Sequence, residues 1–336
     1  MAKKMTVELV AKHAGVSPAT VSRVINHPEL VSAKTIARVN ASIQELGYAS
    51  LLDRYRSAKP FDARGPIVVN IPWLDNPFYS EIVHGIRDSA RAAGYDVLIS
   101  WDTPRQSTVD SFCESLRRCG ASGLITMCSL STEIIERIDS ELPTIQCAEN
   151  NPETNVPYVT IDDRAAARTA VEHLIACGCK HLSIISGPES YKYSRGRMEG
   201  FLSVAREHEL SLDPSWILQV PDNNYELACS AATHMLESDN PPDGVFACSD
   251  TYAAAVIRAA RKAGLSVPGD LMVVGFDNID IATMTSPTLT TVNQPRYRMG
   301  YGACNLLLER MSGNGSAHSM VMETELIVRE STARRP

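Results

Sequence analysis

The chain has 336 residues, 44% of them hydrophobic, which is enough for two or three domains with sizeable buried cores. Its net charge is −7, yet residues 1–60 carry nine basic and four acidic side chains, giving +5 there and −12 on the remainder. No stretch approaches the roughly 20 apolar residues that cross a bilayer, and the amino-terminal segment lacks the apolar core of a secretory signal. We therefore expect a cytoplasmic protein with no membrane partner.

The charge asymmetry favours a basic end that meets phosphates and an acidic body that stays away from them, although chance variation of the surface is an alternative. The nine cysteines are spread singly between Cys113 and Cys304, mostly in apolar runs. This usage is typical of small core residues in a reducing compartment. Cys177 and Cys179 form the only close pair, and no second pair follows at zinc spacing, so we expect no metal site.

The first predicted elements are three short helices within residues 6–47. Thr6 can cap the first helix, Gly15 provides a turn, and Ser17 can cap the second helix, with Pro18 at its first position. Ser32 can cap the third helix, which ends at Gly47. Apolar residues recur at helical spacing in all three: Val7, Leu9, Val10, Ala14, Val16, Val21, Val24, Ile36, Val39, Ile43 and Leu46.

Two short helices joined at a glycine predict a helix-turn-helix, whose second helix enters the major groove of DNA. The polar face of that helix, with Ala19 and Asn26 among its residues, points outward. Hydroxyl groups can bind phosphate oxygens at Thr6, Ser17, Thr20 and Ser22. Arg23 can read guanine through two hydrogen bonds. An ordinary helical hairpin with a polar face is the alternative interpretation.

Three segments of this head closely resemble the LacI/GalR family of bacterial transcription regulators: residues 14–26, residues 31–35 and the triplet Leu46-Gly-Tyr48. The resemblance implies an operator-binding head over residues 1–48. In that family the two residues after the capping serine help to choose the operator, and here they are Pro18 and Ala19, which can offer only apolar contacts, for example to thymine methyl groups. The full predicted DNA-binding set is Thr6, Ser17, Pro18, Ala19, Thr20, Ser22, Arg23, Asn26, Ser32 and Thr35.

The segment at 49–65 departs from the family pattern. Family members usually continue with Pro-Asn and an Ala-Arg-x-Leu segment, which forms a hinge helix on DNA and wedges its leucine into the minor groove. Counting without gaps places Ser57 at the wedge position, and Leu51, Leu52 or Tyr55 could do the unstacking instead. Members similar to the cytidine repressor also have an irregular hinge. A flexible linker without a DNA role is the alternative.

From Pro66 onward, short apolar runs alternate with helical stretches, which predicts parallel sheets covered on both faces. Two series of such units predict two doubly wound lobes, lobe 1 at about 66–161 and 292–323, and lobe 2 at about 162–291 and 324–336. The expected fold is thus an all-α helix-turn-helix head followed by an α/β body. The predicted strands are 67–72, 97–100, 123–127, 143–147, 158–161, 181–186, 217–220, 244–248 and 271–276.

Ligands of such sheets bind beyond the carboxyl ends of the strands, and two facing lobes form a cleft there. Polar and aromatic residues follow several predicted strands, a set suited to stacking on a ring and binding hydroxyl groups. An aspartate after a strand is more often a helix cap than a ligand-binding residue, so each residue alone is weak evidence for a binding site. The candidate effector-binding set is Trp73, Asn76, Phe78, Tyr79, Glu149, Arg197, Asp222, Ser249 and Asp277.

Landmarks of the body also resemble the LacI/GalR effector-binding domain, which is itself similar to periplasmic sugar-binding proteins: residues 76–79, 187–188, 197–201, 275–278, 287–295 and 326–332. The resemblance implies that Arg197 and Asp277 grip the effector and that Phe78 and Tyr79 stack on it, with Ser249, Glu149 and Asp222 as weaker candidates. Residues 276–280 and 294–297 look closest to cytidine-repressor-like members.

No dinucleotide, phosphate-loop, zinc-protease or serine-hydrolase motif is present, so we expect no enzyme and no cofactor. The predicted function is an allosteric transcription regulator, a homodimeric repressor that binds a palindromic double-stranded operator and a sugar-like or nucleoside effector. A solute-binding protein is the alternative, which the basic head and the missing export signal argue against.

Overall fold

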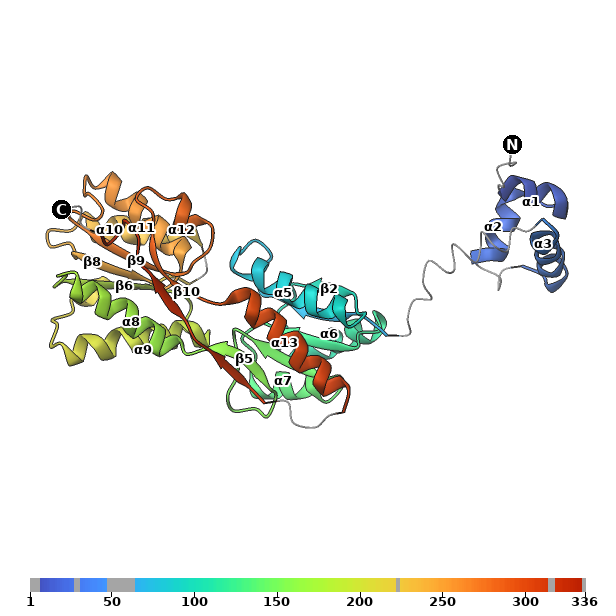
Figure 1. The fold of residues 1–336 in the computed structure, drawn as a ribbon, viewed down its shortest axis with the longest axis horizontal. Helices are drawn as coiled ribbons and strands as arrows, with labels where there is room; N and C mark the ends of the chain where they lie inside the picture. The colour runs from blue at the N-terminus through green and yellow to red at the C-terminus, as the bar shows by residue number, and fades with distance from the viewer. Residues whose placement is uncertain (1–6, 27–30, 47–63, 222–223, 314–317, 334–336) are drawn as a thin grey trace. The chain divides into compact units, whose positions relative to one another are not determined.

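The computed structural model describes residues 7–26, 31–46, 64–221, 224–313 and 318–333. The chain divides into two compact units, Met1–Arg64 and Gly65–Pro336 (Figure 1). Within the described ranges, no helix is long and apolar enough to cross a membrane.

The described residues of the amino-terminal unit form three helices, α1 (Val7–Ala14), α2 (Pro18–Asn26) and α3 (Ala33–Glu45). Val10, Val21 and Val39 lie at the centre of its core, and each is fully buried. Gly15 makes the turn between α1 and α2 with a φ of +62°, a conformation that favours glycine. The hydroxyl of Ser17 accepts a hydrogen bond from the backbone N–H of Thr20 at 3.1 Å, so it caps α2 as the sequence predicts.

The first lobe of the larger unit is a six-stranded sheet with the order β11-β5-β4-β3-β1-β2. Its paired strands run parallel. The strands are β1 (Ile67–Asn70), β2 (Val97–Ser100), β3 (Gly123–Thr126), β4 (Thr144–Cys147), β5 (Tyr158–Ile161) and β11 (Met320–Met322).

Helices cover both faces of this sheet because successive strand residues point to opposite sides. Ile67 and Val69 of β1 pack into one core with α5 (Phe78–Ala92) and α13 (Arg296–Met311). Val68 belongs instead to a second core with α6 (Val109–Arg118) and α7 (Thr132–Asp139). Burial on both faces explains why these strands read as continuous apolar runs.

The second lobe is another six-stranded sheet, with the order β12-β10-β9-β8-β6-β7. Its strands are β6 (Leu182–Ser186), β7 (Ile217–Gln219), β8 (Gly244–Ala247), β9 (Met272–Asp277), β10 (Thr290–Asn293) and β12 (Glu325–Ile327). Figure 1 shows α8 (Asp163–Ala176) and α9 (Lys192–Glu207) on one face. The other face carries α10 (Tyr225–Leu236), α11 (Asp250–Lys262) and α12 (Ile281–Met284). Strand β12 pairs with β10 in antiparallel orientation.

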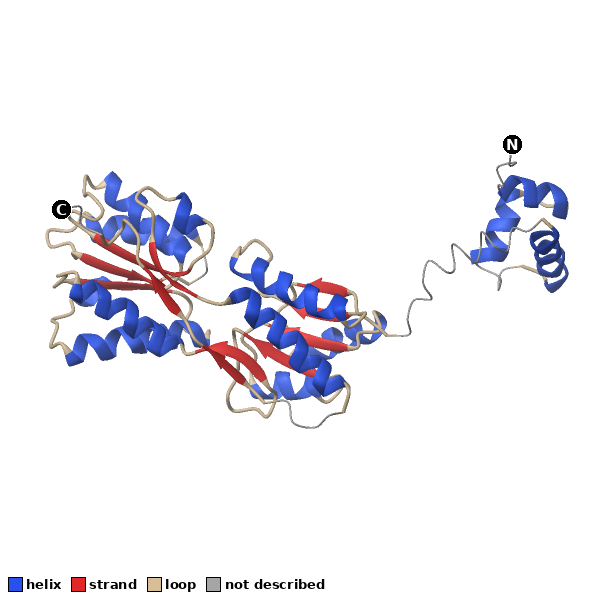
Figure 2. Ribbon diagram, in the orientation of Figure 1, coloured by secondary structure: helices blue, strands red, loops and turns tan. Residues whose placement is uncertain are grey.

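The predicted fold class is therefore confirmed: a helical head and two lobes with largely parallel sheets (Figure 2). The chain crosses between the lobes three times, from β5 to α8, from β10 to α13 and from β11 to β12. The short strands β10, β11 and β12 were not among the predicted strands. Strand β10 (TTVN) has one apolar residue in four, and β11 and β12 are partly exposed, so none of the three reads as a continuous apolar run.

Strand β2 forms one edge of the first sheet and differs from its neighbours in exposure. Leu98 and Ile99 are 46% and 43% exposed, and Trp101, just beyond the strand, is 60% exposed. The central strands β1, β3 and β4 are buried throughout. An apolar edge strand open to water is a surface suited to pairing with another chain.

Candidate functional site

The predicted DNA-binding residues for which the structure describes side chains lie on α2 and at the start of α2 and of α3. Pro18, Ala19 and Arg23 are exposed on α2. Ser17 and Ser32 are exposed just before α2 and α3, where each accepts a hydrogen bond from a backbone N–H three residues later. Thr20 and Thr35 are half-buried, and their hydroxyls bond to those serines at 2.8 and 2.9 Å.

Several predicted residues lie outside the described part of the structure. Thr6 precedes the first described residue, and the side chains of Ser22 and Asn26 are not described. The hinge candidates Leu51, Leu52, Tyr55 and Ser57, and the effector candidate Asp222, also fall outside the described ranges. Their roles stay predictions.

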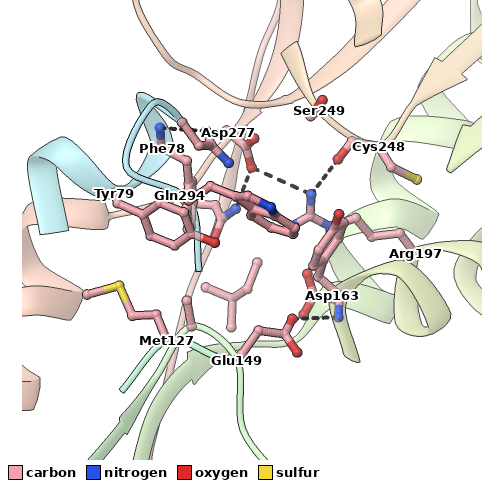
Figure 3. A pocket seen from close by; sticks show the side chains of 15 residues that line it. Phe78, Tyr79, Met127, Glu149, Asp163, Arg197, Cys248, Ser249, Asp277 and Gln294 are labelled. Carbon is pink, nitrogen blue, oxygen red and sulfur yellow. Dashed lines mark hydrogen bonds and ion pairs between the residues drawn. The ribbon is translucent and has the colours of Figure 1, made fainter. Parts of the chain in front are cut away.

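The second candidate site is a cleft at the carboxyl ends of the strands of both lobes, with about 530 Å³ of unfilled space including the part open to solvent (Figure 3). Eight of the nine predicted effector-binding residues line it, and Asp222 is the ninth. The complete lining is Trp73, Asn76, Phe78, Tyr79, Met127, Ala148, Glu149, Ile161, Asp163, Tyr193, Arg197, Cys248, Ser249, Asp277 and Gln294.

Arg197 of α9 is the central cation of the cleft and is only 4% exposed. Its Nε lies 2.9 Å from Asp163 Oδ1, and its Nη1 lies 3.5 Å from Asp277 Oδ1 (Figure 3). Nη1 also donates to the carbonyl of Cys248 at 2.7 Å. Burial opposes the charge, but the two carboxylates outweigh it and raise the pKa of Arg197. The guanidinium is thus held charged between two acids.

Asp277 ends β9 with an unusual backbone conformation, φ +111°. Its Oδ1 accepts a hydrogen bond from Gln294 Nε2 at 2.7 Å. Burial raises the pKa of Asp277, while the nearby Arg197 and Arg296 act in the opposite direction. A buried acid in this position can accept hydrogen bonds from ligand hydroxyl groups.

Asp250, the first residue of α11, holds the loop that presents Asp277. Its carboxylate accepts hydrogen bonds from the backbone N–H of Ile279 at 2.8 Å and from Thr291 Oγ1 at 2.5 Å. Residue 275 must be glycine here, because a Cβ at Gly275 would come within 2.4 Å of Asp250 Oδ1. Asp250 therefore positions the cleft without lining it.

Glu149 follows β4 in the first lobe, and its carboxylate reaches across to the second lobe (Figure 3). Its two oxygens accept hydrogen bonds from the backbone N–H groups of Lys192 and Tyr193 at 2.8 and 3.0 Å, at the start of α9. Burial is the largest influence and raises the pKa of Glu149. The sequence analysis predicts that Glu149 binds the effector, but in this structure both of its carboxylate oxygens accept hydrogen bonds from the protein backbone.

Aromatic side chains form the wall of the cleft in the first lobe. The ring centroids of Phe78 and Tyr79 lie 5.2 Å apart at 77°, an edge-to-face arrangement. Trp73 packs against Tyr191 of the second lobe, with 5.0 Å between centroids. This wall can stack on an apolar ring face of a ligand.

Asn76 and Ser249 line the cleft, and the side chain of each also accepts a hydrogen bond from a backbone N–H at the start of α5 or α11. Asn76 Oδ1 accepts from the backbone N–H of Phe78 at 3.0 Å, and Ser249 Oγ accepts from that of Tyr252 at 3.2 Å. Helix capping, the alternative considered for an aspartate after a strand, thus describes Ser249, whereas Asn76 makes a turn just before α5.

Three cleft residues with polar groups are absent from the predicted set: Asp163, Tyr193 and Gln294. Asp163 follows β5, so the rule that selected Glu149 after β4 could have found it. Gln294 lies inside the 287–295 landmark. Tyr193 belongs to the segment before Arg197, where no pattern distinguishes it.

Comparisons with known proteins match both units of the chain. Residues 6–50 match the family described as bacterial regulatory proteins, lacI family, and residues 171–332 match the periplasmic binding protein-like domain. The HTH-type transcriptional repressor CytR of Escherichia coli (strain K12) is 36% identical over 335 residues, covering 98% of this chain and 97% of the relative.

Solved structures are similar over almost the whole chain. The transcriptional regulator CelR–cellobiose complex matches with a TM-score of 0.71 and 28% identity, covering 98% of this chain and 100% of that one. The lac repressor dimer bound to operator and the anti-inducer ONPF matches with a TM-score of 0.73 and 25% identity, covering 99% and 100%.

Proposed function

Because this chain belongs to the lacI family of bacterial regulatory proteins, we propose that it is a transcriptional repressor that binds operator DNA as a homodimer and responds to a small effector in its cleft. The observation that carries the proposal is the combination in one chain of a helix-turn-helix head and a two-lobed cleft built around Arg197. A solute-binding protein, the alternative from another class, does not account for the head. An enzyme does not account for the head either, so we propose that the protein has no catalytic activity. We also propose that it is located in the bacterial cytoplasm, where the operator is.

Binding to DNA should depend steeply on salt, because each phosphate contact releases counterions. A mobility-shift titration at several salt concentrations, with a palindromic operator and a scrambled duplex, tests this function directly. If neither duplex binds at low ionic strength, the repressor function is wrong.

Replacing Arg23 with alanine should relax operator specificity, because a bidentate arginine–guanine contact discriminates by about 1–3 kcal/mol. We expect the preference for the operator over single-base variants to fall by about 5- to 150-fold at one position. Lys34, an exposed residue in the first turn of α3, gives a matched control. Its alanine variant should weaken binding to all duplexes alike. Unchanged discrimination in the Arg23 variant would exclude base reading by this residue.

The effector class that suits the cleft is a small polar ligand with a ring and several hydroxyl groups, such as a sugar or a nucleoside. Asp277 and Arg197 supply hydrogen-bond acceptors and donors, and Phe78 and Tyr79 supply a stacking surface. The similarity to a regulator bound to cellobiose supports this class. A thermal-shift screen of sugars, sugar acids and nucleosides would identify the ligand.

Replacing Asp277 with alanine should abolish the effector response and leave operator binding intact. Losing one partner of a buried, hydrogen-bonded charge pair costs about 2–5 kcal/mol, so effector affinity should fall by about 30-fold or more. Asp280, an exposed residue three positions further on, provides the control, and its alanine variant should respond normally. A normal effector titration of the Asp277 variant in the mobility-shift assay would contradict the pocket assignment.

Effector binding should act by changing how the two lobes face each other. The cleft is bridged by Glu149 with the start of α9 and by Trp73 with Tyr191. A ligand shifts such an equilibrium only by binding one arrangement more tightly, typically with about 1–3 kcal/mol of coupling. The change in the arrangement of the lobes would then separate the two helix-turn-helix heads of the dimer or bring them into alignment.

The exposed β2 edge is the surface that we assign to the dimer contact in the first lobe. Leu98, Ile99 and Trp101 expose apolar area on a strand that has a free side. A second copy would cover these side chains by two-fold symmetry, which is the usual arrangement for homodimers. Such symmetry also matches a palindromic operator.

A further inference from the structure

Glu149 is an acidic side chain of the cleft whose two oxygens are already bonded to the protein. It is 5% exposed, and both of its oxygens are bonded to backbone N–H groups of α9. The amino-terminal end of a helix carries unpaired N–H groups and a positive dipole end, and it is therefore a natural place for an anion. In this protein the anion at that place is a side chain of the opposite lobe.

The charges around the cleft leave little attraction for a second anion. Three carboxylates line it, those of Glu149, Asp163 and Asp277, and Arg197 is the one basic residue among the described lining residues. Arg197 is already shared between Asp163 and Asp277. The ammonium group of Lys192, next to the cleft, is also paired, at 2.9 Å from Asp163 Oδ2.

We propose that Glu149 is a specificity-determining residue, which occupies the helix terminus in place of an acidic ligand group and restricts the cleft to effectors without phosphate or carboxylate groups. A phosphorylated ligand would have to displace Glu149 from α9 and leave its carboxylate buried beside two others, which is unfavourable. An uncharged ring with hydroxyl groups meets no such barrier. This inference rests on the proposed effector role of the cleft.

The hydrogen bonds between Glu149 and α9 also hold the two lobes together. Its carboxylate belongs to the first lobe and its two donors belong to the second. Hydrogen bonds that involve a charged group are about twice as strong as neutral ones. A ligand that left this contact intact would therefore bind to lobes that are already held together.

The test uses the full-length protein and inorganic phosphate as the probe. Glu149→Ala frees the N–H groups of Lys192 and Tyr193, so we expect its dissociation constant for phosphate, measured by isothermal titration calorimetry, to be at least tenfold lower than that of the wild type. Glu149→Gln keeps the size of the side chain but removes its charge, and it should shift the constant in the same direction. It also serves as the test variant if Glu149→Ala does not fold.

Glu189→Ala is the matched control, because Glu189 is exposed and lies three residues before α9. It removes the same charge but should bind phosphate no better than the wild type. A crystal structure of Glu149→Ala with phosphate should place the ion on the backbone N–H groups of Lys192 and Tyr193.

Equal phosphate affinity in the wild type and both Glu149 variants would overturn the proposal, as would a phosphate bound elsewhere in the variant. These measurements require neither DNA nor the natural effector. Failure of the repressor function would appear instead as an absence of operator binding, so the two failures are distinguishable.

Discussion

Replacing Arg197 with alanine is expected to lower the free energy of unfolding of the effector-binding unit by about 3–5 kcal/mol and to abolish the effector response. The side chain is almost fully buried between Asp163 and Asp277. Its removal leaves Asp277 without its ion-pair partner and Asp163 paired only with Lys192, in a largely buried site. The guanidinium also lies 3.5 Å from the centroid of the Phe276 ring, and that contact is lost.

Arg195→Ala provides the control, because Arg195 lies two residues earlier on the same helix but is exposed. Its unfolding free energy should stay within about 0.5 kcal/mol of the wild type, as for most surface substitutions. Both variants can be compared by urea denaturation, followed by effector titration in the mobility-shift assay. Equal stability of the two variants would mean that Arg197 is not the centre of a buried charge network.

The double substitution Leu98→Asp and Ile99→Asp is expected to convert the proposed dimer into a monomer and to weaken operator binding by about 100-fold or more. Each copy would bring two carboxylates to the β2 edge, so four would meet across a two-fold contact. A monomer then binds one half-site and loses the advantage of two linked heads, which is worth a factor of about 10²–10⁴. Sedimentation velocity and a mobility-shift titration measure both effects.

Val321→Asp is the control for a charge on the same sheet. Val321 belongs to β11, at the opposite edge from β2, and is 61% exposed. The variant should remain dimeric and bind the operator normally. If Val321→Asp produced a monomer and the β2 substitutions did not, the dimer contact would lie at the β11 edge of the sheet instead.

The sequence predicted the fold well because the relevant signals are local. The helical spacing of Val10, Val21 and Val39 identified the core of the head, and continuous apolar runs identified the strands. Eight of the nine effector candidates line one cleft; seven of these were found by the rule that ligands lie beyond strand ends, and Arg197 was found from its place at a helix start and from the family resemblance.

The roles of individual cleft residues were harder to predict, because they depend on partners that are distant in the sequence. Glu149 is 43 and 44 residues away from the two N–H groups that it binds. Asp163 is 34 residues from Arg197, and nothing in the local sequence indicates that they pair. A strand-end position shows where a side chain lies, but not which of its hydrogen bonds the protein already uses.

The chain crosses between the lobes three times, and this has a consequence for its synthesis on the ribosome. The first sheet lacks β11 until residue 322 has emerged, and the second lacks β12 until residue 327. Neither lobe can therefore be completed by a nascent chain much shorter than these 327 residues, whereas the three described helices of the head lie within the first 45 residues. A chain released early would carry a folded helix-turn-helix head without the complete effector-binding lobes that control it.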